Sequence, residues 1–424
     1  MILYLMKFSW RSFLEMNQEH KQFIGVISEF AHSNQIQQIV CGDKWKLVEN
    51  ISRKHNLFPL FFDVASKYNS YLQTNHYNQS MEEAMFIIAL QVKRTDSFLK
   101  LYKSFIIGEV YPLVMKGLIC RSLYGELCDH RPSGDEDILV PISDFWRAKT
   151  ILEENGYFPI EEVREDIDLS SVQEITFVNQ EENLHIELHL NPMGRENDAR
   201  SQMSDCFKDV FDDYIEMEIQ GVKVRTMSHQ NHFTFLILHA LRHFLGGGIG
   251  LRQMLDILLY QEKYGPEIDI DKLEETLQQF KAVSFWSDLV HIGNKYLGFN
   301  LPIRHEACCA EELLEDMMSN GVFGNDTAAK RTAERTVMFV TGDYLRDKKT
   351  NKVAMILKTI FPSKEYLLTN SPYLREKPWL LPIAWVERWC RFLKRNSAQD
   401  NSLMQESLTI SARRTALLKK YDIL

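Results

Sequence analysis

The spacing of apolar residues predicts helices in both end regions of the chain and strands between them. Over residues 81–107, apolar side chains recur every three or four positions, as on one face of an α-helix. Over 184–190 they alternate strictly with polar ones, which predicts a half-buried strand. Two short apolar runs flanking Gln220-Gly221 predict a hairpin. Helical spacing returns after Ser228, a favourable N-cap. The pattern predicts an α+β protein with a mixed sheet between helical segments.

These changes of period divide the chain into three expected regions. We expect an N-terminal helical region over 1–107, an α/β domain over 108–226 and a C-terminal helical region over 227–424. Helical spacing over 328–345 belongs to the third region. Residues 344–396 are basic, with 12 Lys or Arg against 4 Asp or Glu.

This basic stretch changes the charge picture. The whole chain carries a net charge of -9, so the remainder carries -17 and the stretch +8. Trp379, Trp385 and Trp389 lie in the same stretch. The simpler interpretation is an amphipathic helix that packs its tryptophans inward with Lys and Arg in solvent. The alternative is an anionic partner: nucleic acid, an anionic membrane or an acidic protein.

Composition excludes several classes of protein. With 424 residues, 45% of them hydrophobic, the chain can bury a large core and is not intrinsically disordered. A sequence pI near 5.9 argues against a uniformly basic nucleic-acid binder. The seven cysteines are scattered without a CxxC pair, which favours neither a disulfide framework nor a Cys-rich zinc site. No uncharged apolar run reaches about 18 residues, so we expect no transmembrane segment and a cytoplasmic protein.

The most informative chemistry lies in one acidic strand. Asp135 and Asp137 precede an apolar run, so as strand residues they share one face. Two such carboxylates repel each other unless a cation lies between them, and Mg²⁺ (or Mn²⁺) favours carboxylate and phosphate oxygens. Gly134 would allow a tight bend before the pair. Glu187, on the alternating strand, could complete a three-carboxylate site for two metals about 4 Å apart. Most isolated Asp-x-Asp pairs are solvated loop charges, and the placement is what favours a metal site here.

Several separated motifs occur together in a recognisable order. They are Lys116-Gly117, Arg131, Gly134-Asp135-x-Asp137, Glu187-Leu188-His189, His239-x-x-x-His243, and Gly250-Leu251-Arg252 with Asp256. In this order they resemble the polymerase-beta-like nucleotidyltransferase superfamily, and more narrowly an uncharacterised bacterial nucleotidyltransferase family. The resemblance covers roughly residues 108–260.

The resemblance implies an enzyme that moves a nucleoside monophosphate from an NTP donor to an acceptor, using Mg²⁺ or Mn²⁺. The acceptor is undetermined: a small molecule, a protein or a nucleic acid. The implied catalytic and metal-binding residues are Asp135, Asp137 and Glu187. On the substrate and phosphate side we place Lys116, Gly117, Arg131, Gly134, His189 and Arg252, since Lys and Arg are suited to phosphate. An ion pair between Arg252 and Asp256, four residues apart, is the simpler expectation for that arginine.

Two departures from the superfamily pattern keep an alternative open. Leu118 follows Gly117 where a serine is usual, and Glu136 stands between the aspartates where an apolar residue is usual. Both favour a catalytically degenerate module that binds a nucleotide or a partner.

A third interpretation is a His/carboxylate metallohydrolase. Its candidate ligands are His185, Glu187, His189, His239 and His243. For the last two histidines, packing against the α/β unit or a hydrogen bond to Asp256 is the simpler role. The HExxH glutamate is absent, which excludes a metalloprotease of that type.

Overall fold

The computed structural model describes residues 17–32, 44–193, 201–246, 248–320, 361, 364–367, 371–374, 377–395 and 416–423. The helix predicted over 328–345 and much of the basic stretch 344–396 lie outside these residues. The chain divides into two compact units, 1–325 and 326–424, and each is described by itself. The three-region division expected from the sequence stays a prediction.

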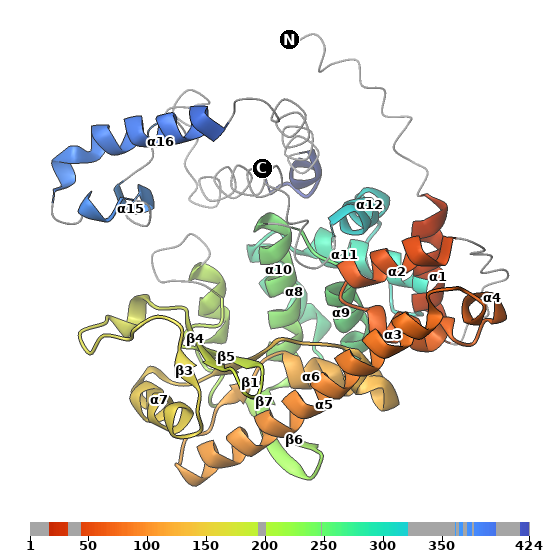
Figure 1. Ribbon diagram of the computed structural model, residues 1–424, viewed down its shortest axis with the longest axis horizontal. Helices are drawn as coiled ribbons and strands as arrows, with labels where there is room; N and C mark the ends of the chain where they lie inside the picture. Colours follow the sequence, from red (N-terminus) through yellow and green to blue (C-terminus); the bar gives the residue numbers. More distant parts are fainter. Residues whose placement is uncertain are drawn as a thin grey trace. The chain divides into compact units, whose positions relative to one another are not determined.

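Five helices open the first unit (Figure 1). They are α1 (Gln18–His32), α2 (Trp45–Lys54), α3 (Phe58–Ala65), α4 (Asn69–Leu72) and α5 (Tyr77–Ile107). The long helix predicted from the apolar spacing of residues 81–107 is confirmed as α5. Phe98, Leu101 and Phe105 recur at helical spacing on α5 and are buried. Through contacts with α3, α7 and β7, this helix packs between the other N-terminal helices and the strands.

The central sheet has five strands in the order β1-β2-β5-β4-β3. The strands are β1 (Leu113–Val114), β2 (Asp135–Leu139), β3 (Phe158–Pro159), β4 (Glu174–Asn179) and β5 (Leu184–His189). Only β2 and β5 pair in parallel; the other pairs are antiparallel, so the sheet is mixed. The expected α+β class with a mixed sheet is confirmed, and the strictly alternating segment is β5.

Short helices and a hairpin complete the α/β part of this unit. They are α6 (Gly117–Arg121), a 3-10 helix (Ser122–His130), α7 (Phe145–Glu154), and the hairpin strands β6 (Tyr214–Ile219) and β7 (Val222–Met227). Gln220 and Gly221 both adopt positive φ, 49° and 76°, as a two-residue type I′ hairpin turn requires. The hairpin predicted at this dipeptide is confirmed.

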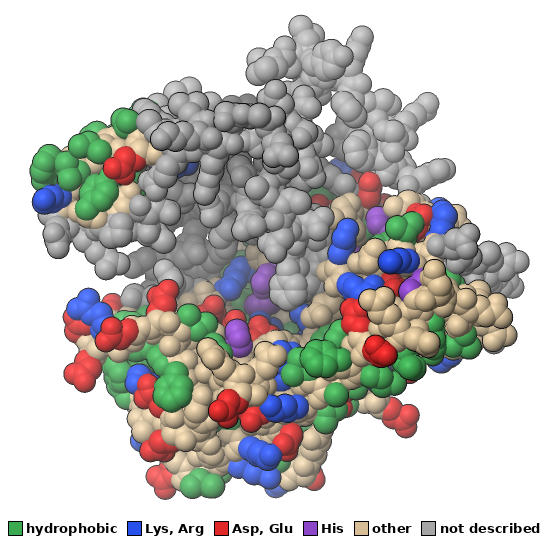
Figure 2. Space-filling view, viewed as in Figure 1, with side chains coloured by type: hydrophobic (Ala, Val, Ile, Leu, Met, Phe, Trp, Pro, Cys, Tyr) green, Lys and Arg blue, Asp and Glu red, His purple; other side chains and the backbone are tan. Residues whose placement is uncertain are grey.

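Five further α-helices follow the hairpin among the described residues of the first unit. They are α8 (His229–Gly246), α9 (Leu251–Tyr264), α10 (Ile270–Gln279), α11 (Val283–Ile292) and α12 (Ala310–Asn320). The predicted N-cap is confirmed, because the Asn231 N–H donates to Ser228 Oγ at 3.3 Å. Helix α8 contacts β7, α9 and α10, and so connects the sheet region to the C-terminal helices. On the face shown in Figure 2, acidic and basic side chains are interspersed over the described residues. None of the described helices is both long and apolar enough to cross a membrane.

The second unit contains α15 (Lys364–Leu367) and α16 (Leu381–Arg395). Leu367, Leu374 and Ala384 form a small buried cluster, and Trp385 packs against it. Trp379 is 73% exposed, which corrects the expectation that the tryptophans of the basic stretch all pack inward. The Trp389 side chain is outside the described part of the chain.

Candidate active site

Strand β2 presents Asp135 and Asp137 on one face and Glu136 on the other. Parallel pairing with β5 places Asp137 opposite Glu187. Asp137 is only 2% exposed, whereas Asp135 and Glu187 are half-buried. The topology therefore brings two of the three predicted carboxylates to adjacent strands at one depth in the sheet, with Asp135 at the start of β2.

Lys116 supplies a positive charge at the centre of this acidic face. It directly precedes α6, and its Nζ lies 2.8 Å from Asp137 Oδ1. The same ammonium group donates to His239 Nε2 at 3.1 Å. Burial lowers the pKa of Lys116, but the neighbouring Asp137 and Asp135 carboxylates outweigh burial, so its pKa is raised overall.

His189 shares the same aspartate oxygen. Its Nε2 lies 3.2 Å from Asp137 Oδ1 and 3.6 Å from Glu187 Oε2. Burial would raise the pKa of Asp137, but Lys116 and His189 hold it below its ordinary value. Burial likewise would lower the pKa of His189, whereas the carboxylates raise it to about 9. His189 lowers the pKa of Glu187, yet burial and the Asp137 charge together raise it.

These side chains fit a divalent metal. One ligand atom each of Asp137, Glu187 and His189 lies within 4.8 Å of the other two. Carboxylate oxygens and an imidazole nitrogen suit divalent cations. Asp135 is not part of this group; its carboxylate accepts from Ser133 Oγ at 3.0 Å. In the nucleotidyltransferase interpretation of the sequence, Asp135 was the third ligand, and His189 was a candidate ligand only in the metallohydrolase interpretation.

Glu136 has a separate role on the opposite face of β2. It is fully buried, pairs with Arg121, and accepts the Leu118 N–H at 2.8 Å. Gly117 has φ of 37°, and a Cβ built on it would lie 1.9 Å from Glu136 Oε2. Glycine is required at 117 because this carboxylate packs directly on it. The pairing with Arg121 was missed from the sequence, although a buried acid between two aspartates does require a nearby cation.

The predicted bend at Gly134 does not require glycine. Its φ is not positive, and an added Cβ would meet no atom within 4 Å. The neighbouring loop residues are instead held by side chains from distant helices. Asn56 donates to Pro132 O at 3.2 Å, while Gln91 accepts the Ser133 N–H at 2.7 Å and Arg94 donates to Ser133 O at 3.0 Å. None of these three partners was identified from the sequence.

Arg131 and Arg252 lie differently from the expectation. Arg131 donates to both carboxylate oxygens of Asp256, at 2.7 and 2.5 Å, and is buried. Tyr124 donates to the same aspartate at 2.8 Å. Asp256 is therefore the partner of Arg131, and the expected ion pair with Arg252 is not the one it makes. Arg252 Nη1 donates to Pro132 O at 2.6 Å, and its buried Nε has no hydrogen-bond partner among the described residues.

The two histidines of α8 converge on each other. His239 Nε2 and His243 Nε2 lie 3.2 Å apart. Burial and the Lys116 charge lower the pKa of His239 and lower that of His243 to about 3, so both are neutral near pH 7. The alternative hydrogen bond to Asp256 is not formed, since Arg131 and Tyr124 hold that carboxylate. His185 is exposed at the start of β5.

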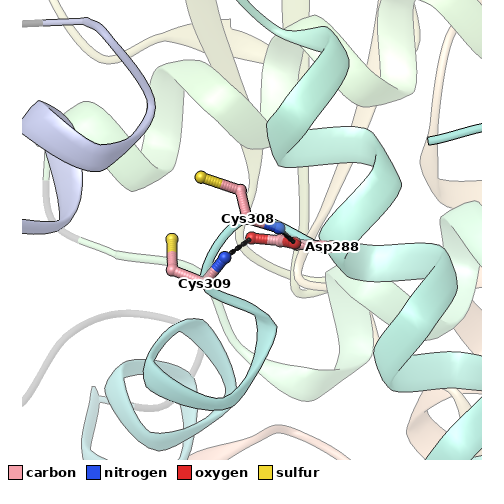
Figure 3. Close-up of side chains that lie close together, drawn as sticks. All are labelled: Asp288, Cys308 and Cys309. Atoms are coloured by element: carbon pink, nitrogen blue, oxygen red, sulfur yellow. Dashed lines mark hydrogen bonds between the residues drawn. The ribbon is translucent and has the colours of Figure 1, made fainter. Parts of the chain in front are cut away.

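A second cluster of metal-type ligands lies away from the sheet (Figure 3). Asp288 on α11 and the adjacent Cys308 and Cys309 offer ligand atoms within 4.8 Å of one another. The buried Asp288 carboxylate accepts the backbone N–H groups of Cys308 and Cys309 at 2.7 and 2.8 Å. These bonds anchor the segment before α12 to α11, which is a structural reason for the buried acid. No local sequence pattern indicates this contact.

Comparison with known proteins bears on the acidic site. A solved structure of the antibiotic-resistance factor ANT(2'')-Ia is similar, with 13% sequence identity and a TM-score of 0.32, over 47% of this chain and 97% of that one. The search among curated proteins gives no significant match. The family described as "Uncharacterised nucleotidyltransferase" matches residues 42–298, which is more than half of the chain and confirms the predicted family. This chain belongs to the uncharacterised nucleotidyltransferase family.

Proposed function

We propose that this chain is a metal-dependent nucleotidyltransferase that moves a nucleoside monophosphate from an NTP to an acceptor. Membership of the family supports nucleotidyl transfer in general. The observation that carries the finer proposal is the parallel β2–β5 pairing, which sets Asp137 opposite Glu187 with Lys116 Nζ 2.8 Å from Asp137. In the reaction, the acceptor oxygen forms a bond to the α-phosphorus, and the bond between the α-phosphorus and the oxygen bridging it to the β-phosphorus breaks. Pyrophosphate and the acceptor proton leave.

The carboxylates would hold the metal and Lys116 would meet the phosphates. A bound divalent metal supplies charge neutralisation and lowers the pKa of the acceptor hydroxyl. Asp137 is suited to metal binding because its lowered pKa keeps it ionised. Asp135, on the same face of β2, is the proposed ligand on the solvent side. When a nucleotide binds, the Lys116 ammonium would exchange its ion pair with Asp137 for one with the triphosphate.

The phosphate contacts come from side chains and not from a helix end. The Leu118 N–H at the start of α6 is already donated to Glu136, so it is not available to a phosphate. The buried Nε of Arg252 has no hydrogen-bond partner among the described residues, which favours this arginine as a phosphate ligand. Arg131 is committed to Asp256, and we assign it a positioning role.

The alternatives have less support. Glu136 points away from Asp135 and Asp137 and is neutralised by Arg121, so it does not argue for a degenerate module. The missing serine after Gly117 remains the one feature that favours such a module. A metallohydrolase using His239 is disfavoured, because the single lone pair of His239 Nε2 already accepts the Lys116 ammonium at 3.1 Å.

The test is nucleotidyl transfer with labelled substrate. Each of the four NTPs, labelled at the α-phosphate, is incubated with Mg²⁺ or Mn²⁺ and a cell extract as the acceptor pool. We expect label in an acceptor, with a loss of at least about 100-fold in Asp137→Asn, as for removal of one electrostatic contact to the transition state. Asp166→Asn, at an exposed aspartate, is the matched control. Failure of every NTP to label an acceptor, with Asp137-dependent NTP binding, would identify the degenerate binding module instead. If Asp137→Asn leaves NTP binding unchanged, both the nucleotidyltransferase proposal and the binding-module alternative are wrong.

A further inference from the structure

The imidazole of His189 is directed between the two carboxylates that face each other across β2 and β5. Its Nε2 lies 3.2 Å from Asp137 Oδ1 and 3.6 Å from Glu187 Oε2. Adjacent ligands of an octahedral cation bound at 2.0–2.1 Å are separated by about 3 Å. Both distances are somewhat longer than this spacing, and the ligand atoms of the three residues lie within 4.8 Å of one another, so they can close on one ion once the Lys116 ammonium moves away from Asp137 Oδ1.

The other nitrogen of the ring faces a further carboxylate. His189 Nδ1 lies 3.4 Å from Glu174 Oε2, an ion-pair distance without hydrogen-bond geometry, and Glu174 is the register partner of His189 on β4. His189 is 4% exposed, which restricts rotation of the ring. Histidines that bind metals commonly direct their second nitrogen at a carboxylate, which fixes the ring and its tautomer. A proton on Nδ1 leaves the Nε2 lone pair directed at the position between Asp137 and Glu187.

We propose that His189 is a metal ligand together with Asp137 and Glu187, and that its nitrogen makes the site prefer a first-row transition-metal ion such as Mn²⁺ over Mg²⁺. Mg²⁺ is bound almost entirely by oxygen, whereas imidazole suits first-row transition metals. Glu174 is a positioning residue that acts through the His189 ring. The inference deepens the proposed function and rests on it for the use of the metal in transfer, while metal binding is measured without any reaction.

A different role for His189 would use the same contacts. In that role the imidazolium forms only ion pairs with Asp137 and Glu174 and binds no metal. Lys116 already supplies Asp137 with a cation at 2.8 Å, so charge compensation of Asp137 does not depend on His189. The two roles differ in what happens to metal selectivity when the nitrogen is removed.

The experiment measures Mn²⁺ binding by the electron paramagnetic resonance signal of free Mn²⁺, and Mg²⁺ binding by competition, at one fixed pH. We expect His189→Gln to weaken Mn²⁺ binding by about 10–100-fold and Mg²⁺ binding by much less, so that the Mn²⁺/Mg²⁺ preference falls at least tenfold. His189→Asp, which supplies an oxygen ligand, should retain binding and shift the preference to Mg²⁺. Glu174→Gln should weaken Mn²⁺ binding by about tenfold, at the lower end of the range for outer-shell partners.

His305→Gln is the matched control, since His305 is an exposed histidine outside the strands that carry the site. It should leave both affinities unchanged, and circular dichroism checks that each variant is folded. An unchanged Mn²⁺/Mg²⁺ preference in both His189 variants would overturn the inference and leave His189 as an ion-pair partner. His189-dependent Mn²⁺ selectivity without nucleotidyl transfer in the wild type would support the inference and count against the proposed function. Nucleotidyl transfer by the wild type, together with an unchanged metal preference in His189→Gln, would support the proposed function and count against the inference about His189.

Discussion

Removing the carboxylate of Glu136 should destabilise the protein strongly although it lies outside the proposed metal site. Glu136 is 0% and Arg121 2% exposed, and the Arg121 Nε and Nη1 atoms have no hydrogen-bond partner among the described residues. Glu136→Leu would leave a buried guanidinium without its counter-charge, which costs about 3–5 kcal/mol. It would also leave the Leu118 N–H unpaired. For a protein of this size we expect the melting temperature to fall by about 3–6 °C.

Thermal and urea unfolding followed by circular dichroism measure this effect. The double variant Glu136→Leu/Arg121→Leu removes both charges, and replacing a whole buried pair by apolar residues is often neutral. We therefore expect it to recover most of the loss. Glu136→Gln keeps an acceptor for Leu118 and should be less destabilising than Glu136→Leu. A cost below about 1 kcal/mol in Glu136→Leu, or a double variant as unstable as the sum of the single ones, would refute the buried-pair reasoning.

Three further predictions concern the titratable side chains of Lys116, Asp256 and His232. Without nucleotide, Lys116→Met should tighten Mn²⁺ binding by about tenfold, or about 1.4 kcal/mol, because the cation beside Asp137 is gone. The same variant should weaken NTP binding. Isothermal titration calorimetry measures both affinities, and weaker Mn²⁺ binding would contradict the prediction. Asp256→Asn should cost about 3–5 kcal/mol of unfolding free energy by leaving Arg131 buried without its counter-charge, and an unchanged urea midpoint would contradict it. Burial lowers the pKa of His232 from 6.5 to about 3, so its contribution to stability is complete above pH 6.5 and is lost as the pH falls toward 3. His232→Gln should reduce the slope of unfolding free energy between pH 6 and 4 by up to about 1.4 kcal/mol per pH unit, and an identical slope would contradict this.

The sheet and the family could be predicted from local sequence patterns. The alternation over 184–190 and the Gln220-Gly221 turn are properties of a few consecutive residues, and the structure has both elements. Contacts between distant residues had no such signal. Arg121 could not be assigned as the partner of Glu136, because that pairing depends on how α6 packs against β2. For the same reason the glycine that packing requires is Gly117 and not Gly134.

The metal-site residues were only partly accessible from the sequence. Asp137 and Glu187 lie opposite each other because β2 and β5 pair in parallel. The strand patterns placed Glu187 on a neighbouring strand but did not determine this register. His189 was placed on the substrate side, since a sequence does not show that its ring turns toward both carboxylates. Its assignment as a ligand, like that of Asp135 and Glu187, stays a prediction.

The hold on residues 131–134 has a consequence for how this protein can be divided. Asn56, Gln91 and Arg94 hold the loop from the N-terminal side, and Arg252 and Asp256 hold it from the C-terminal side. An excised fragment of residues 108–226 would lose all five partners of the loop that precedes the acidic strand β2. The segment shared with the family, 42–298, contains every one of them. A fragment with these bounds keeps the helices whose side chains anchor the loop before β2. It is therefore the smallest fragment worth expressing for measurements of metal binding.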